Sequence, residues 1–138
     1  MEHTYKMVPK DYRMPKGFDV NVDEEYKQAL KDYPTFKSIG VGAIIYSDNL
    51  KPHLKDSLEE EKTAKWYYWQ AQKALSYIDT MIRLYSNSEY NWKKEDAGEY
   101  IIAKNRIEKD LKQYKYDIAK AKVQYELIKL EIFMRSKT

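Results

Sequence analysis

Apolar residues recur at every third or fourth position through the last third of the chain. The longest series lies within Asp96–Lys137, and its gaps alternate between four and three residues. Its members are Ile107, Leu111, Tyr114, Ile118, Ala121, Tyr125, Ile128 and Ile132. Two apolar positions in every seven residues predict a helix that packs against other helices. No proline interrupts the stretch, and its one glycine, Gly98, falls in the first turn, so we expect one helix of roughly 60 Å.

A second series with the same spacing precedes it. Its members are Ala64, Tyr67, Ala71, Ala74, Ile78, Met81 and Tyr85, with Tyr68, Leu75 and Ile82 beside them. This helix is expected to begin either near Pro52, which suits a first helical position, or at a capping box formed by Ser57 and Glu60. The acidic run Glu59–Glu61 would then lie near the positive end of the helix dipole.

The polar stretch Asn87–Glu95 joins these two helices, and a connection of this length predicts an antiparallel hairpin. Lengths of roughly 30 and roughly 40 residues would leave about ten residues of the second helix overhanging. Apolar residues surround the helix there: Leu127, Ile128, Leu130, Ile132, Phe133 and Met134. Such an end must be covered. We expect the N-terminal segment to cover it through Phe36, Ile39, Val41, Ile44 and Ile45. The alternative is a homodimer through Leu127, Leu130, Phe133 and Met134.

The N-terminal third contains shorter elements. Residues 1–20 hold Pro9, Pro15 and Gly17 and read as an irregular arm. A helix is expected over 22–33, with Asn21 and Glu24 as a capping box and Pro34 as its end. Its apolar face would contain Val22, Tyr26, Ala29, Leu30 and Tyr33.

Residues 35–50 fit a buried strand or a short buried helix equally well, and Gly17–Val22 could pair with Ile39–Tyr46 as a small ribbon. The predicted fold class is therefore mainly α, with one domain over 1–138. It consists of the arm (1–20), an N-terminal helical or α+β subdomain (21–50) and a coiled-coil-like helical hairpin (51–138), with the subdomain packed on the open end of the hairpin.

Composition narrows the classes of protein that fit. Aromatic residues make up 14% of the 138 residues, which excludes an ordinary disordered tail. The absence of cysteine excludes disulfides, thiolate nucleophiles and Cys-ligated zinc, and it fits a cytoplasmic protein. The start of the chain lacks the apolar core of a signal peptide, and the longest apolar run is too short to span a bilayer, so no membrane partner is expected.

Catalytic chemistry has little support in the sequence. The only two histidines, His3 and His53, are far apart, and no metal-binding or nucleophile motif contains either. Gly40 and Gly42 lack the Lys-Ser/Thr pair of a phosphate-binding loop. We therefore expect no enzyme activity, no catalytic residue, no metal and no cofactor.

Surplus aromatic residues favour protein binding instead. The helix that carries Trp66 and Trp69 presents aromatic side chains on more than one face, so these two are either covered by the N-terminal segment or serve as anchors for a partner. Expected partner contacts are Trp66, Trp69, Tyr90, Trp92 and Tyr116. The small size, the absence of catalytic motifs, the surplus aromatic residues and the abundance of residues with AT-rich codons (Lys, Tyr, Ile and Asn) together favour a phage or mobile-element accessory protein. We expect it to bind and inhibit a host protein, for example a defence factor.

Two alternatives use other surfaces. Nucleic acid could bind the basic face of the last helix through Lys104, Arg106, Lys109, Lys112, Lys115, Lys120 and Lys122, with Tyr116 stacking on a base. However, Glu108, Asp110 and Asp117 lie among these cations, as on an ordinary solvated helix. A structural subunit that assembles with itself through the apolar C-terminal end is the other alternative.

Overall fold

The computed structural model describes residues 14–33, 48–86 and 94–137. Within those ranges the chain forms three α-helices and no strand: α1 (Asp23–Lys31), α4 (Lys51–Ser86) and α5 (Lys94–Ser136). The prediction of a mainly α protein in which two long helices pack together is confirmed. The choice between strand and helix over most of 35–50, and the connection between the long helices, lie outside the described ranges.

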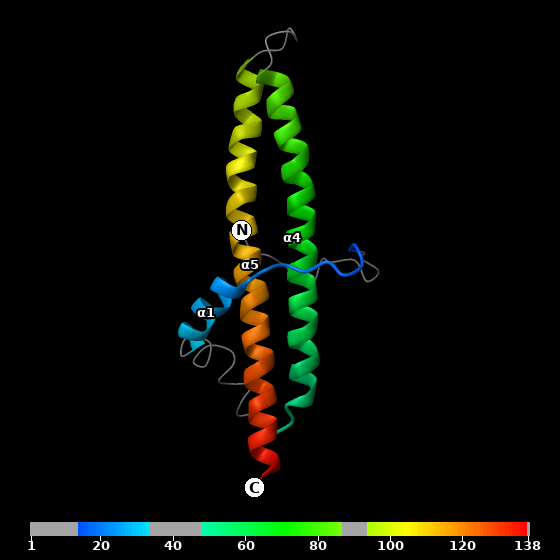
Figure 1. Cartoon of the computed structure of the whole chain (residues 1–138), viewed down its shortest axis with the longest axis vertical. Helices are drawn as coiled ribbons and strands as arrows, with labels where there is room; N and C mark the ends of the chain where they lie inside the picture. Colours follow the sequence, from blue (N-terminus) through cyan, green and yellow to red (C-terminus); the bar gives the residue numbers. More distant parts are fainter. Residues whose placement is uncertain (1–13, 34–47, 87–93, 138) are drawn as a thin grey trace.

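The two long helices α4 and α5 lie side by side and run in opposite directions (Figure 1). As residue numbers fall along α4, the numbers of the contacting residues rise along α5. Contacts spread along the pair join Tyr85 to Tyr100, Asp79 to Lys104, Tyr67 to Tyr114 and Glu61 to Lys122. The interface therefore keeps one register from end to end.

The apolar series predicted from the sequence form this interface. Every predicted position on both helices is buried or half-buried. Ile118 and Ile128 of α5 are fully buried, as is Ala64 of α4. The seven-residue spacing thus identified the faces through which α4 and α5 pack.

The start of α4 agrees with the first of the two predicted positions. Asn49 Oδ1 accepts a hydrogen bond from the Lys51 backbone N–H at 3.2 Å, which caps the helix. The predicted start at Ser57 is wrong, because Ser57 is buried inside α4 and its hydroxyl donates to the His53 carbonyl at 3.0 Å. The predicted place of Glu59–Glu61 in the first turn is wrong for the same reason. With 36 residues in α4 and 43 in α5, the overhang is also shorter than expected.

A second apolar face runs along α5, and we call it the outer stripe. Its members are Tyr116, Ala119, Val123, Leu127, Leu130 and Met134. Since an α-helix has 3.6 residues per turn, this spacing places them on the side of α5 opposite the α4 interface. The first half of the stripe is covered by residues 18–33, the cover segment, which contains α1 (Figure 1).

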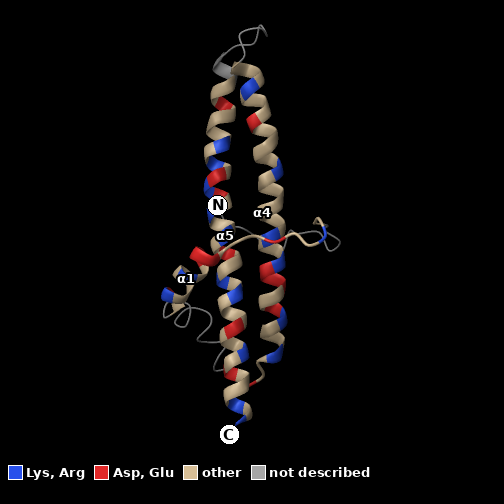
Figure 2. Ribbon diagram, in the orientation of Figure 1, with Lys and Arg blue, Asp and Glu red and all other residues tan. Residues whose placement is uncertain are grey.

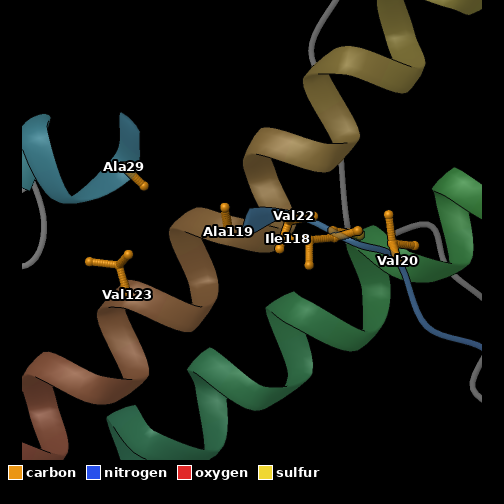
Figure 3. Close-up of a cluster of buried hydrophobic side chains, with 7 residues drawn as sticks. Val20, Val22, Ala29, Ile118, Ala119 and Val123 are labelled. Carbon is orange, nitrogen blue, oxygen red and sulfur yellow. The ribbon is translucent and has the colours of Figure 1, made fainter. Parts of the chain in front are cut away.

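Small apolar side chains join the cover segment to α5. Val20, Val22 and Ala29 form one buried cluster with Ala119 and Val123. Figure 3 shows Ala29 of α1 on the side of α5 from which Ala119 and Val123 project. Ala29, Ala119 and Val123 are fully buried, so the two helices approach closely here.

Local sequence determines the path of the cover segment. Gly17 has φ +77°, a left-handed conformation that side chains disfavour, in a turn closed by the Phe18 N–H donating to the Pro15 carbonyl at 3.0 Å. Asn21 Oδ1 accepts a hydrogen bond from the Asp23 N–H at 3.0 Å at the start of α1, but Val22 is the N-cap residue, so the predicted capping box of Asn21 and Glu24 is wrong. Leu30 is 45% exposed, so its predicted place on the buried face is wrong. Gly17–Val22 forms no strand, so the described half of the predicted ribbon is absent.

In the part of the chain that the structure describes, the C-terminal end of the outer stripe is exposed, and we call it, together with the neighbouring Phe133, the open end. Leu130, Phe133 and Met134 are 55%, 53% and 55% exposed, whereas Ile128, on the α4 side, is fully buried. The residues predicted to cover this end, Phe36, Ile39, Val41, Ile44 and Ile45, lie outside the described residues, so that prediction stays untested.

Replacing Ile118 with Ala tests the packing of α5. The side chain is fully buried where the α4 interface meets the cover segment cluster, so Ile118→Ala should lower the free energy of unfolding by about 2–5 kcal/mol. Ile102, on the same helix, is 64% exposed, and Ile102→Ala should change it by less than about 0.5 kcal/mol. Urea unfolding followed by circular dichroism measures both. Equal losses for the two variants would contradict the packing.

Candidate functional site

The aromatic residues predicted to bind a partner occupy different environments. Trp66 and Trp69 on α4 are both half-buried, an exposure that fits partial cover by the N-terminal segment and an anchoring role alike. Trp66 packs edge-on against Tyr67 with ring centroids 5.2 Å apart, and Lys73 Nζ lies 4.4 Å from the Trp69 ring centroid. Both indoles thus retain accessible surface on a rigid helix. Tyr90 and Trp92 lie outside the described residues.

Tyr116, predicted to be an exposed contact, bonds within the chain. Its hydroxyl donates to Asp32 Oδ2 at 2.5 Å, which ties the residue after α1 to α5. Burial and then this hydrogen bond raise the pKa of Tyr116 to about 12. The phenol therefore holds the cover segment in place.

Two ion pairs also connect the cover segment to the long helices. Lys65 Nζ on α4 lies 3.0 Å from Asp19 Oδ1, and this hydrogen bond is the main cause of the lowered pKa of Asp19. Lys115 Nζ on α5 lies 3.7 Å from Glu25 Oε2. In both pairs the cover segment supplies the carboxylate and the long helix supplies the cation. Ion pairs with partly exposed members contribute little to stability and weaken in salt.

The seven cations predicted to bind nucleic acid do not form one surface. Lys104, Lys115 and Lys122 pair with carboxylates of Asp79, Glu25 and Glu61. Lys120 borders a small hollow that it shares with Glu60 and Asp117. The three others, Arg106, Lys109 and Lys112, are exposed on the outer face of α5, above the cover segment. Acidic residues alternate with basic ones along both long helices (Figure 2).

The open end of the outer stripe was not distinguished in the sequence analysis. The sequence predicts apolar residues all round the end of α5, without a division of these residues into two faces. The spacing from Tyr116 to Met134 carries the signal, because its gaps of three and four residues run opposite the first series. Contiguous exposed apolar residues mark interaction sites.

Other kinds of site find no geometric basis in the described residues. In that part of the chain, no group of three or more His, Asp or Glu side chains lies close enough together to hold a metal ion. None of the described helices is long and apolar enough to cross a membrane. Among the described residues, the open end of the outer stripe gathers three apolar side chains that are each more than half exposed, and the half-buried indoles of α4 are a second accessible feature.

Replacing Tyr116 with Phe tests the bond to Asp32. The raised pKa means that folding favours the neutral phenol, so its contribution is complete below pH about 10 and is lost as the pH rises toward about 12. At pH 8, Tyr116→Phe should lower the free energy of unfolding by about 1 kcal/mol. That difference should shrink between pH 8 and pH 11. Urea midpoints across this range measure it, and the titrating lysines and Tyr114 are common to both proteins. A difference independent of pH would contradict the assignment.

Three comparisons with known proteins were made for the whole chain. A scan against protein-family models, a search of curated proteins and a search of solved structures each gave no match. Function is therefore argued from the residues and geometry above.

Proposed function

We propose that this chain is a non-enzymatic protein-binding module, a cytoplasmic phage or mobile-element accessory protein that docks on and inhibits a host protein such as a defence factor. One observation carries the binding part of this proposal. Leu130, Phe133 and Met134 are each more than half exposed and lie within two turns of one helix. Exposed apolar side chains gathered in this way are typical of protein-binding surfaces.

The half-buried indoles support the same proposal. Trp66 and Trp69 lie on α4, a helix held rigidly by its interface with α5. Tryptophans in such positions are frequent anchors of protein interfaces, because they bury a large area at a small entropic cost. We propose them as further contacts, with Tyr90 and Trp92 as the predicted contacts of the connection.

The proposal includes the finer architecture. The long helices form an antiparallel hairpin closed by residues 87–93, and the N-terminal segment packs near the open end of this hairpin, where it leaves Leu130, Phe133 and Met134 exposed. The stacking of Tyr85 on Tyr100, with ring centroids 5.4 Å apart, supports the first part, since it brings the end of α4 to the start of α5. Tyr33 packs in the same cluster as Leu127, which supports the second part.

Nucleic-acid binding is the alternative for which Arg106, Lys109 and Lys112 remain exposed. The alternation of charges in Figure 2 weighs against it, because a phosphate backbone requires a surface of one sign. Self-assembly through Leu127, Leu130, Phe133 and Met134 is a second alternative, and it uses the same open end.

Affinity capture from a nuclease-treated bacterial lysate tests the proposed function. The wild-type chain should retain a protein partner, and Leu130→Asp with Phe133→Asp should abolish that capture, because charges on the open end prevent apolar docking. Leu58→Asp is the matched control, since Leu58 is also exposed (49%) but lies on α4, and it should retain the partner.

Three outcomes would contradict the proposal. Capture that survives the double substitution would exclude the open end as the binding surface. Binding that disappears with nuclease and falls steeply with salt would favour nucleic acid. Self-assembly would be favoured if the molecular mass measured by light scattering rises with the concentration of the wild-type chain and stays at the monomer value for the double variant.

A further inference from the structure

The outer stripe is longer than the segment that covers it. Along α5, the 19 residues from Tyr116 to Met134 span about 27 Å. Ala119 and Val123 are fully buried beneath the cover segment, whereas Leu130 and Met134 are each 55% exposed. The stripe is thus one continuous apolar surface, of which α1 occupies the first half.

The occupant of the first half shows what chemistry the stripe accepts. α1 presents Val22, Tyr26 and Ala29 to α5, and Tyr33 follows them at the same three- and four-residue spacing. Its first turn is acidic, with Asp23, Glu24 and Glu25. Residues 22–32 contain four carboxylates against Lys27 and Lys31, so the occupant is an amphipathic helical segment with a net negative charge concentrated in its first turn.

Cations at both ends of the stripe match that charge. Lys115 of α5 contacts Glu25 at the covered end. At the open end, Lys137 Nζ lies 4.6 Å from the ring centroid of Phe133. A longer acidic helix would therefore meet a positive charge at each end and apolar residues between.

The cover segment is suited to displacement. α1 has nine residues, fewer than an isolated helix needs to be stable in water. Apart from its small apolar cluster, it is held by the Tyr116–Asp32 hydrogen bond and by ion pairs with partly exposed members. The buried cluster joins the cover segment to Ala64 and Ile118 of the α4–α5 interface, but α1 itself contributes only Ala29 and the partly buried Tyr26 to it, so most of this cluster remains when α1 leaves.

We propose that the outer stripe is a docking groove for an acidic amphipathic helix of a partner protein, and that this helix displaces α1 to occupy the groove along its full length. The inference rests on the proposed protein-binding function and names the surface and the chemistry of the partner. α1 then acts as an internal competitor, and the apparent affinity of the groove is its intrinsic affinity multiplied by the fraction of molecules in which the groove is uncovered.

A synthetic peptide that contains residues 22–32 twice in tandem serves as the probe. An 11-residue repeat keeps the apolar side chains of both copies on one face of a helix. The helical peptide is about 33 Å long, enough for the whole stripe. A peptide with a single copy of residues 22–32 is the length control, and a tandem peptide with every Asp and Glu changed to Lys is the charge control.

Fluorescence anisotropy of the labelled peptides with the full-length chain measures binding. The tandem peptide should bind about tenfold or more tightly than the single copy, because it alone reaches the open half. The Lys-substituted peptide should not bind. The double variant Leu130→Asp with Met134→Asp should bind the tandem peptide only as tightly as the wild-type chain binds the single copy. Both residues are exposed enough for the fold to tolerate the change.

Hydrogen exchange of the protein amides measures displacement. Binding of the tandem peptide should speed exchange in Asp23–Lys31 and slow it around Leu130. No saturable binding, equal binding of the Lys-substituted peptide, or binding that leaves α1 exchange unchanged would each overturn the proposal. Peptide binding as expected, together with a failure to capture any protein from lysate, would support the groove while counting against the proposed function.

Discussion

The rest of the structure depends on apolar contact between α5 and its neighbours on two opposite sides. One side packs on α4 in a single register from Glu61–Lys122 to Tyr85–Tyr100. The other side, from Tyr116 to Met134, receives the cover segment over its first half. Because α5 contributes to both contacts, every other described element is positioned by it. This explains why the largest fully buried side chains, Ile118, Ile128 and Val123, all belong to α5.

The two faces of α5 also connect stability with the proposed binding. The α4 interface supplies a rigid rod, so side chains on the opposite face are held at fixed spacing whether or not they are covered. Above Tyr116 that opposite face is mostly polar and basic, with Asn105, Lys109 and Lys112 exposed, and it also exposes Ile101 and Ile102. Below it the face is apolar. The change in character along one helix separates a solvated surface from a surface that binds another helix.

Much of the fold could be predicted from the sequence, because long helices that pack together have apolar residues at regular intervals of three and four positions. The series from Ile107 to Ile132 and from Ala64 to Tyr85 located the α4–α5 interface, and Asn21 located the start of α1. Helix ends were harder: Ser57 has a capping sequence, but Asn49 already caps the helix upstream, so Ser57 is interior. The spacing places Leu30 on the apolar face of α1, but Leu30 is exposed. The buried position is that of Ala29, whose small side chain allows α1 to lie close to Ala119 and Val123 of α5.

The candidate site was less predictable, because exposure depends on tertiary contacts. Tyr116 and Lys115 read as surface residues on α5, but Asp32 and Glu25, more than 80 positions earlier in the chain, bind them. Local spacing cannot reveal a partner so distant in sequence. For Trp66 and Trp69 the sequence left two environments open, and the structure places both residues between them. The apolar C-terminal end divides into two faces because a second series of apolar residues, from Tyr116 to Met134, runs through the same part of α5 as the first series. Two overlapping series are hard to separate in the sequence alone.

The continuity of α5 is the most direct test of this account, since both apolar faces exist only on an unbroken helix. The chain has no cysteine, so spin labels can be attached to cysteines introduced at the exposed residues Asn105 and Glu126 alone. Pulsed electron spin resonance should then give one narrow distance distribution near 32 Å, the length of that span as continuous helix. A broad distribution, or one centred at a much shorter distance, would show a broken helix and contradict the account.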